Sequence, residues 1–369
     1  MATDIKNLKI ALVHDWLLGV GGAEKVVKTL HEIFPSAPIY TLLHNKKFTE
    51  KFLPNVEIRS TFLQKIFNFT KSHKTLLPLM PIAVESLDLS EFDVVISSSV
   101  TFAKGLILKP QTLHICYCHS PTRQIWDWHS EYKKESKQSN RLVNSVFQHL
   151  LRIWDRHAST RVDQFIATSE NVKHRIQKYY QRNSELIYPP VDLVSANQTE
   201  KGEYFLIVSR LFKHKNVGIA VEAFNKLGWP LVIIGEGPEY KKLRKMAEKN
   251  VKFMGYQPDD LVQKYYAGCS GFIMPQEEDF GITPIEAMGH GKPVLALKRG
   301  GALEYVQEGI NGEFFEDPTE EVLADGVRRI RDNISKYDPS EIKRTVERFS
   351  RTRFESEIKN LISSYVLPS

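Results

Sequence analysis

Short apolar runs that alternate with longer amphipathic stretches constrain the fold of this chain more than any other feature of its sequence. Eight runs rich in Val, Ile, Leu and Phe are predicted to be buried strands, at residues 8–13, 94–97, 114–117, 164–167, 204–208, 231–234, 271–274 and 293–296. Helical spacing of apolar residues lies between them, at 23–33, 220–227, 239–249, 259–266 and 284–288. Buried strands separated by helices indicate a parallel α/β fold.

A pair of prolines interrupts this pattern once, near the middle of the chain. Pro189 and Pro190 precede the polar stretch 195–202, after which a new strand starts. Proline fixes φ and has no amide donor, so we interpret this segment as a linker. The 369 residues also exceed the roughly 250 to 300 at which a single core stops growing. We therefore predict two doubly wound, Rossmann-like domains, 1–190 and 191–345, that face one another across a cleft.

Composition narrows the class of protein. A chain with 42% hydrophobic and 25% charged residues is expected to fold, and no uncharged apolar stretch reaches the roughly 18 residues of a spanning helix. The N-terminus does not read as a secretory signal, and three cysteines without a Cys-x-x-Cys pair are typical of a reducing compartment. We expect the chain in the cytoplasm, with the inner face of the cytoplasmic membrane as the place of any lipid contact.

The charge is uneven along the chain. Residues 1–190 carry 25 Lys and Arg against 17 Asp and Glu, whereas residues 191–369 carry 25 against 27. A modest basic excess in one half fits an anionic lipid surface or a phosphorylated acceptor better than duplex DNA, so no nucleic-acid partner is expected. Lysines scattered over a solvated surface explain the same numbers.

Glycines follow the first predicted strand where a helix begins. Gly19, Gly21 and Gly22 would let backbone amides approach a phosphate at the positive end of that helix. NAD binding is disfavoured, because the Gly-x-Gly-x-x-Gly spacing and an acidic residue at the end of the second strand are both missing. A tight turn without a ligand is the other interpretation.

Two further clusters lie in the second half. Arg210 and Lys215 follow the strand at 204–208, where they could neutralise a diphosphate, although a solvated basic loop fits as well. Glu278 precedes a helix that Pro284 could open, and Glu286 lies inside that helix. Carboxylates there can accept hydrogen bonds from sugar hydroxyls, but acidic residues near helix N-termini are also common stabilisers.

Together these residues resemble the retaining family 4 glycosyltransferases of GT-B fold, along nearly the whole chain. The resemblance includes the glycine loop, Arg210 with Lys215, and Glu278 seven residues before Glu286. Supporting marks are Gly235-Glu236-Gly237-Pro238, Phe253-Met254-Gly255-Tyr256, Tyr266-Ala267, Gly300-Gly301 with Glu304, and Gly309 with Gly312. The N-terminal half, at 13–16, 21–25 and 117–123, is similar to mannosyltransferases that build bacterial O-antigen and related polysaccharides.

The resemblance implies roles for individual positions. Arg210 and Lys215 would bind the diphosphate of a nucleotide sugar, and His119 would contact the donor sugar near the reacting centre. Glu278 would hold sugar hydroxyls and Glu286 the ribose. The remaining donor-binding positions implied are Gly21, Gly22, Met254, Tyr256, Phe280, Gly281, Ile282 and Thr283.

The implied reaction is transfer of a hexose with retention, from GDP-mannose by preference, to a glycan or lipid-linked acceptor in polysaccharide or lipopolysaccharide biosynthesis. A double displacement needs two carboxylates about 5 to 5.5 Å apart, and no clear pair is present, so a front-face mechanism is the working hypothesis. No cofactor and no metal are expected, because the chain has no Asp-x-Asp. The alternative is an inactive nucleotide-sugar-binding or scaffold protein of the same fold.

Two segments add to this interpretation. Residues 62–77 combine aromatic side chains with lysines, a composition that suits the interface of an anionic membrane and equally a core helix with solvated lysines. Residues 341–365 form a helical stretch longer than the domain needs. By the same resemblance, the C-terminal helix at 346–369 is expected to cross back to the N-terminal domain.

Overall fold

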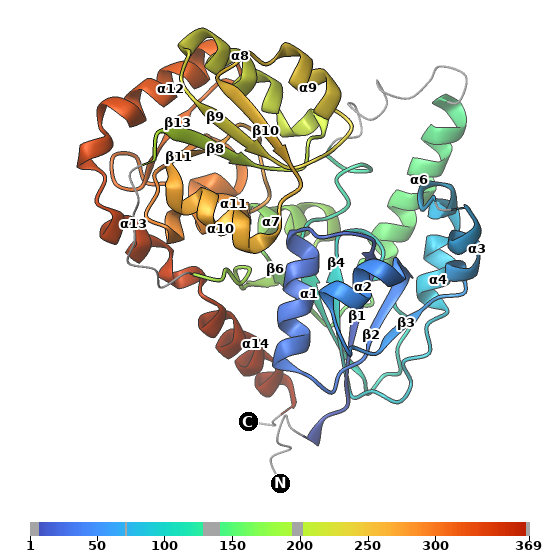
Figure 1. The fold of residues 1–369 in the computed structure, drawn as a ribbon. Helices are drawn as coiled ribbons and strands as arrows, with labels where there is room; N and C mark the ends of the chain where they lie inside the picture. The colour runs from blue at the N-terminus through green and yellow to red at the C-terminus, as the bar shows by residue number, and fades with distance from the viewer. Residues whose placement is uncertain (1–6, 71, 128–140, 194–201, 367–369) are drawn as a thin grey trace. The chain divides into compact units, whose positions relative to one another are not determined.

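The computed structural model describes residues 7–70, 72–127, 141–193 and 202–366. Contacts divide the chain into two compact units. Unit 1 comprises residues 1–190 together with 354–369, and unit 2 comprises residues 191–353. Figure 1 shows a parallel sheet with helices around it in each unit.

Unit 1 is built on a seven-stranded sheet in the order β3-β2-β1-β4-β5-β6-β7, with every pairing parallel. Its strands are β1 (Ile10–Leu17), β2 (Ile39–His44), β3 (Ile58–Ser60), β4 (Val94–Ser99), β5 (Leu113–Cys118), β6 (Gln164–Ala167) and β7 (Ser184–Leu186). The chain moves outward from β1 in one direction and then returns to start β4 on the other side. The carboxyl ends of β1 and β4 therefore flank the switch point, where open α/β sheets bind ligands.

The helices of unit 1 cover both faces of this sheet. They are α1 (Gly22–Ile33), α2 (Lys46–Phe52), α3 (Leu63–Thr70), the 3-10 helix η2 (Lys74–Leu79), α4 (Met80–Glu85), α6 (Arg141–Ser159), α7 (Glu170–Arg175), the π-helical turn η4 (Ile176–Tyr180) and α14 (Arg351–Val366). Alternation along β1 sends Leu12 into a core with α1 and Val13 into a second core with α3, η2 and α4. The sheet is thus buried on both sides, as its near-continuous apolar strands predict.

The end of the chain differs from the single helical stretch predicted at 341–365. α13 (Pro339–Val346) is followed by the 3-10 turn η8 (Glu347–Phe349), and Ser350 is extended and bridges to Val191, which breaks the helix. α14 begins at Arg351 rather than at 346. Phe354 and Ile358 of α14 are buried in the core of unit 1 that contains Leu12.

Unit 2 is built on a six-stranded parallel sheet in the order β10-β9-β8-β11-β12-β13. Its strands are β8 (Tyr204–Val208), β9 (Leu231–Ile234), β10 (Val251–Gly255), β11 (Cys269–Met274), β12 (Val294–Leu297) and β13 (Gly312–Phe315). Its helices and 3-10 turns, besides α13 and η8, are η5 (Lys213–Lys215), α8 (Val217–Leu227), α9 (Tyr240–Met246), α10 (Asp259–Gly268), α11 (Ile282–Gly289), η6 (Gly300–Glu304), α12 (Glu320–Asp332) and η7 (Ile334–Lys336). The switch point here lies between β8 and β11.

The α/β class and the doubly wound architecture predicted from the sequence are confirmed. β6, β8 and β9 have the predicted bounds, but the prediction for the first strand ended too early. β1 continues to Leu17, so His14 and Asp15 belong to the strand and are buried, at 1% exposure each. Polar residues inside a buried strand were interpreted as the start of a loop, because strand patterns are recognised by apolar side chains.

Candidate active site

Loops after the neighbouring strands β8 and β11 bring predicted site residues together at the switch point of unit 2. Nζ of Lys215, at the end of η5, forms an ion pair with Oε1 of Glu278 in the loop after β11. Gln276 donates from Nε2 to the same carboxylate oxygen at 2.9 Å. The side chains of Lys215 and Glu278 are 12% and 23% exposed, so this cluster is partly open to a ligand.

Arg210 lies on the same loop after β8 but is exposed. The centre of its guanidinium is 5.7 Å from the centre of the Phe212 ring, a cation–π arrangement. Arg210 therefore lies on the same loop as Lys215, with its charge at the surface.

The loop that carries Glu278 is held by a close approach of backbone. Gly301 donates its amide to the carbonyl of Glu278 at 2.9 Å, and a Cβ on Gly301 would lie 2.5 Å from Cα of Phe280. Gly281 has φ of 91°, a conformation that residues with a Cβ rarely adopt. Glycine at both positions therefore fixes the path of the loop into α11.

Helix α11 presents a bare N-terminus at the end of this loop. Its N-cap residue is Gly281, which makes no side-chain capping bond, and Ile282 and Thr283 open the helix. The first amides of such a helix are donors without intrahelical partners, and they suit an anionic or hydroxyl oxygen. Phe280 is buried beside them and packs edge-on against Tyr305.

Glu286 lies deeper than the sequence suggested. It is 9% exposed on α11, and its Oε2 accepts a hydrogen bond from the Tyr266 hydroxyl at 2.8 Å. Burial, together with the charge of Glu286, raises the pKa of Tyr266 well above its usual value. Tyr266 thus acts as a fixed donor that orients one side of the carboxylate.

Met254 and Tyr256 flank Gly255 at the carboxyl end of β10, and are 36% and 60% exposed. The amide of Gly235 donates to the Gly255 carbonyl at 2.8 Å, which joins the ends of β9 and β10. The structure places these two side chains at the same sheet edge as the Lys215 loop, two strands away from β8.

In unit 1, Asp15 organises the switch point. Its two carboxylate oxygens accept four backbone hydrogen bonds, from Val100 and Thr101 at 2.6 and 2.8 Å and from Phe102 and Ala103 at 2.6 and 2.7 Å. The loop after β4 is therefore wrapped around a buried carboxylate at the end of β1.

A chain of polar contacts runs from the start of α1 to His119. Nε2 of His14 lies 3.8 Å from Oε1 of Glu24, and Nδ1 of His14 bonds to the Ser98 carbonyl at 2.9 Å. The Ser98 hydroxyl is 2.8 Å from Nε2 of His119, which follows β5. Gly21, in extended conformation, is the N-cap residue of α1 and Gly22 is its first residue, with no side chain capping that end.

The pKa values of the two histidines, His14 and His119, are shifted in opposite directions. Burial disfavours the charged form of His14, but the interaction with Glu24 outweighs it and the pKa of His14 is raised. His119 is partly buried, and burial and the nearby His14 lower its pKa to about 3. His119 is therefore neutral at physiological pH, whereas the pKa of His14 lies above its ordinary value.

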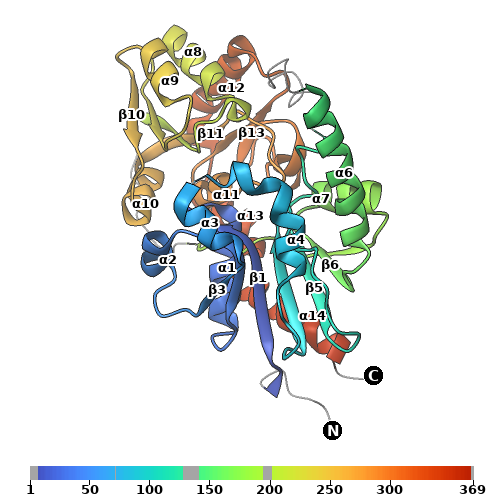
Figure 2. The same ribbon diagram turned by 90° about the vertical axis from the view of Figure 1, so that its right-hand side faces the viewer.

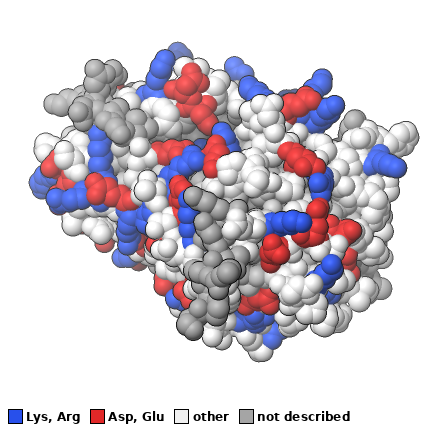
Figure 3. Space-filling model, turned by 90° about the horizontal axis from the view of Figure 1, so that it is seen from below, with Lys and Arg blue, Asp and Glu red and all other residues white. Residues whose placement is uncertain are grey.

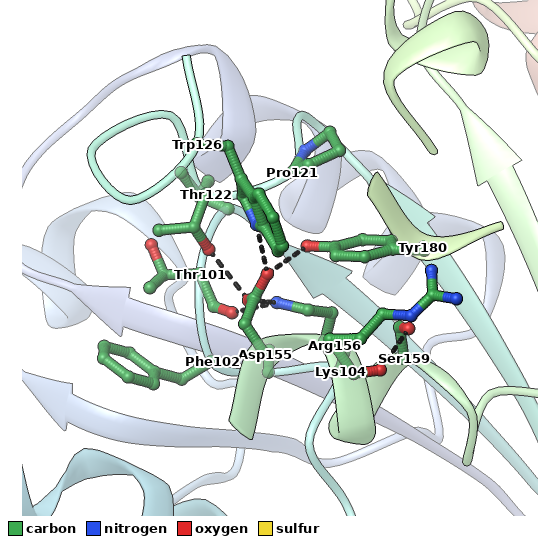
Figure 4. Close-up of polar contacts among 12 residues, drawn as sticks. Thr101, Phe102, Lys104, Pro121, Thr122, Trp126, Asp155, Arg156, Ser159 and Tyr180 are labelled. Atoms are coloured by element: carbon green, nitrogen blue, oxygen red, sulfur yellow. Dashed lines mark hydrogen bonds and ion pairs between the residues drawn. The ribbon is translucent and has the colours of Figure 1, made fainter. Parts of the chain in front are cut away.

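A buried ion pair supports the loop that follows His119. Lys104 and Asp155 are 1% and 2% exposed in their side chains, and Nζ lies 2.5 Å from Oδ1. Asp155, on α6, also accepts hydrogen bonds from Thr122 at 3.0 Å, Trp126 at 2.8 Å and Tyr180 at 2.9 Å (Figure 4). One carboxylate thus ties α6, η4 and the segment 122–126 together.

The sequence analysis named the glycine loop, Lys215 and Glu278 as candidates. It did not predict the residues that support them. Ser98, Lys104 and Asp155 carry no motif, and each acts through a partner distant in sequence. Asp15 and Tyr266 lie in segments that supported the resemblance, but their hydrogen bonds to the loop after β4 and to Glu286 were not predicted. One available signal was a lone lysine or aspartate inside an apolar run, because such a charge is buried only when it is paired. Among the described residues, no group of three His, Cys, Asp or Glu side chains is arranged to hold a metal ion.

Two family models match consecutive parts of the chain. The model described as Glycosyltransferase Family 4 matches residues 20–195, and the model described as Glycosyl transferases group 1 matches residues 192–343. Alpha-1,3/1,6-mannosyltransferase ALG2 of Dictyostelium discoideum is 23% identical over 98% of this chain and 99% of its own length. The uncharacterized glycosyltransferase MJ1178 of Methanocaldococcus jannaschii is 28% identical over 44% of this chain, and the match spans 47% of that relative.

Solved structures share the fold. Anabaena Alr3699/HepE in complex with UDP and glucose matches with a TM-score of 0.73 and 20% identity, over 97% of this chain and 100% of that one. Sucrose-phosphate synthase from Thermosynechococcus elongatus matches with a TM-score of 0.72 and 16% identity, over 97% and 99%. The chain therefore belongs to the family 4 glycosyltransferases of GT-B fold.

Proposed function

We propose that the chain is a retaining mannosyltransferase that moves mannose from GDP-mannose to a glycan or lipid-linked acceptor in polysaccharide biosynthesis. The observation that carries this proposal is the contact of Lys215 with Glu278 at the switch point of unit 2. A cation and a carboxylate on neighbouring strand ends, beside the bare N-terminus of α11, offer one group for a diphosphate and one for sugar hydroxyls.

The relatives favour mannose as the transferred sugar. ALG2 proteins named as alpha-1,3/1,6-mannosyltransferases match 98%, 81% and 82% of this chain, at 23%, 26% and 23% identity. The solved relative with the TM-score of 0.73 instead holds UDP and glucose. UDP-glucose is therefore the main competing donor, and a comparison of GDP- and UDP-sugars distinguishes the two.

Charge stabilisation at the leaving group is the core of the proposed mechanism. As the bond from the anomeric carbon to the diphosphate breaks, negative charge grows on the diphosphate oxygens, and Lys215 and Arg210 stabilise it. Glu278 and the amides that open α11, near Phe280 to Thr283, hold the sugar hydroxyls. In a front-face reaction a diphosphate oxygen takes the proton of the acceptor hydroxyl as the new bond forms, so the anomeric configuration is retained.

Other proposed contacts follow from the positions described above. Glu286, oriented by Tyr266, accepts hydrogen bonds from the ribose hydroxyls. Met254 and Tyr256 face the base, and Gly21 and Gly22 leave the N-terminus of α1 open to phosphate. His119 is neutral, so we assign it a hydrogen bond to the donor sugar rather than a charge contact.

No cofactor and no metal belong to this proposal, because two cationic side chains supply the charge that a chelated metal would otherwise provide. Chelation by EDTA should leave activity unchanged. None of the described helices has the length and apolarity needed to cross a membrane. We place the enzyme in the cytoplasm, where nucleotide sugars are available.

The proposal is tested by a thermal-shift screen of GDP-, UDP- and ADP-sugars, followed by NMR of the product. A donor at 100 times its dissociation constant should stabilise the chain by about 2.7 kcal/mol. GDP-mannose should give the largest shift and an α-linked product. Stabilisation without product, with any acceptor, would instead favour an inactive nucleotide-sugar-binding protein.

A further inference from the structure

Exposed apolar side chains are concentrated on one helical layer of unit 1, formed by α3, η2, α4 and α6. We call it the α3–α6 layer, and Figure 2 looks toward it. The layer supplies half of the large hydrophobic side chains that are exposed among the described residues. They are Phe62 just before α3, Ile66, Phe69, Leu79, Ile82, Val143, Val146, Leu150 and Ile153.

These side chains are not needed for the core of unit 1. The same segments send Leu63, Leu76 and Met80 inward, where they are buried, and Leu151 and Trp154 pack on that core from α6. The layer thus has two apolar sides, one packed on the sheet and one outward. Phe69 is 91% exposed, which gives it almost no partner within the chain.

Helix α6 is apolar on two sides, whereas an ordinary surface helix is apolar on its core side alone. Its buried positions include Gln148 and Asp155, whereas Val143, Leu150 and Ile153 are 70%, 57% and 55% exposed. A surface helix normally turns its apolar stripe to the core and its polar residues to solvent. The exposed stripe therefore indicates a second apolar environment outside unit 1.

The charged residues of the α3–α6 layer indicate what this second apolar environment is. Among the described residues of α3, η2, α4 and α6, the acidic side chains are Glu85, which forms an ion pair with Arg161, and Asp155, which is buried against Lys104. Lys65 and Lys74 are exposed beside the apolar side chains. On the face in Figure 3, by contrast, acidic and basic side chains alternate. An apolar surface with exposed lysines, whose two carboxylates are already paired with cations, matches the interface of a bilayer that contains anionic lipid.

We propose that the α3–α6 layer docks on an anionic lipid bilayer, with Phe69, Leu150 and Ile153 inserted at the headgroup level. A second copy of the chain fits less well, since an isologous dimer would place the exposed lysines of two identical faces against each other. This proposal rests on the proposed function in one respect, because a lipid-linked acceptor would explain why the chain binds a bilayer.

Co-sedimentation with vesicles tests the docking surface on the full chain without donor or acceptor. Vesicles of phosphatidylcholine mixed with phosphatidylglycerol should retain the wild type, and vesicles of phosphatidylcholine alone should retain much less. The double variants Leu150→Ser/Ile153→Ser and Ile66→Ser/Phe69→Ser should each lower the partition coefficient by about tenfold or more. The matched control is Ile310→Ser/Ile334→Ser, which changes two exposed isoleucines of unit 2 and should leave binding unchanged.

Three outcomes overturn the proposal. They are equal retention on both vesicle types, unchanged retention of both layer variants, and a dimer in light scattering that Leu150→Ser/Ile153→Ser converts to a monomer. Donor binding, followed by thermal shift in the same variants, separates the two proposals. If the layer variants lose vesicle binding but keep the donor shift, the docking surface is supported and the variants are folded. If the wild type shows no donor shift, the proposed function alone is contradicted.

Discussion

The ammonium of Lys215 contacts the carboxylate of Glu278 across the loops that follow β8 and β11, so the two residues neutralise one another in the absence of a ligand. Oε1 of Glu278 also receives a hydrogen bond from Gln276. In the proposed mechanism, a diphosphate that binds Lys215 draws it away from Glu278, whose carboxylate then accepts hydrogen bonds from sugar hydroxyls. We therefore propose that the pair couples recognition of the phosphate to recognition of the sugar.

Replacement of Lys215 or Arg210 by Ala should lower kcat/KM for the donor by about 100- to 1000-fold, because each removes charge stabilisation of the departing diphosphate. Lys213→Ala in the same η5 turn is the matched control and should remain near wild type. Steady-state kinetics of nucleotide release measures all three. If Lys213→Ala and Lys215→Ala lowered kcat/KM equally, the loop would act through its total positive charge and not through a specific contact of Lys215.

Glu278→Gln should raise KM and lower kcat, since an amide keeps the hydrogen bond geometry but loses the charge that strengthens bonds from sugar hydroxyls. Glu277→Gln, one residue earlier, is the control. The same nucleotide-release assay applies, with a thermal-shift titration of the donor beside it. If Glu278→Gln binds and turns over the donor as the wild type does, Glu278 has no part in sugar recognition.

Removal of either partner of the buried Lys104–Asp155 pair should destabilise the chain by about 3 to 5 kcal/mol. Asp155→Ala should cost more than Lys104→Met, because three further donors, from Thr122, Trp126 and Tyr180, also lose their acceptor. The exposed Lys109→Met should stay within about 0.5 kcal/mol. Denaturant unfolding provides the measurement, and strict additivity of the two changes in a double variant would argue against a coupled pair.

Stability should fall in acid through histidines that are buried neutral. Burial lowers the pKa of His114 and, with His14 nearby, that of His119, in both cases from 6.5 to about 3. The unfolded chain therefore takes up protons first, and the free energy of unfolding decreases as the pH falls from about 6.5 toward about 3. His14, whose pKa is raised, acts in the opposite sense: its contribution is present below 6.5 and is lost as the pH rises through its folded pKa.

Unfolding of His114→Gln across this pH range tests the assignment. The glutamine can keep a hydrogen bond to Ser97 but cannot titrate, so the dependence of stability on pH should become shallower. If the slope of unfolding free energy against pH did not change, His114 would not contribute to the loss of stability in acid.

Tyr266→Phe should cost about 1 to 3 kcal/mol of stability, since it leaves the buried carboxylate of Glu286 without its hydroxyl donor. If Glu286 holds the ribose, the variant should also weaken binding of the nucleotide. Isothermal titration with GDP checks this. Loss of stability with unchanged GDP affinity would mean that Glu286 is structural.

The sequence predicted the parallel sheets because buried strands in an α/β protein are continuous apolar runs. β6, β8 and β9 were predicted residue by residue for this reason. The short edge strands β3 and β7 carry polar and charged residues and were missed, since only one side of each pairs. The continuation of β1 through His14 and Asp15 was missed because their partners lie 84 or more residues away.

The candidate site could be proposed from the sequence where a residue's place in an element carries meaning. Glu278 and Glu286 were singled out by their places before and inside a helix, and Arg210 and Lys215 by their place after a strand. Which of them meet depends on how the strand ends are ordered in the sheet, and the adjacency of β8 and β11 is a tertiary property. Burial of Glu286 against Tyr266, and the Asp15 and Asp155 networks, depend on packing that no local pattern encodes.

The most direct test of the central claim is transfer from GDP-mannose by the purified chain, with and without the Lys215→Ala change. The proposed mechanism predicts release of GDP and formation of an α-mannosidic product with the wild type. With the variant, the rate should be lower by a factor of at least about 100. A β-linked product, or equal rates for wild type and Lys215→Ala, would contradict it.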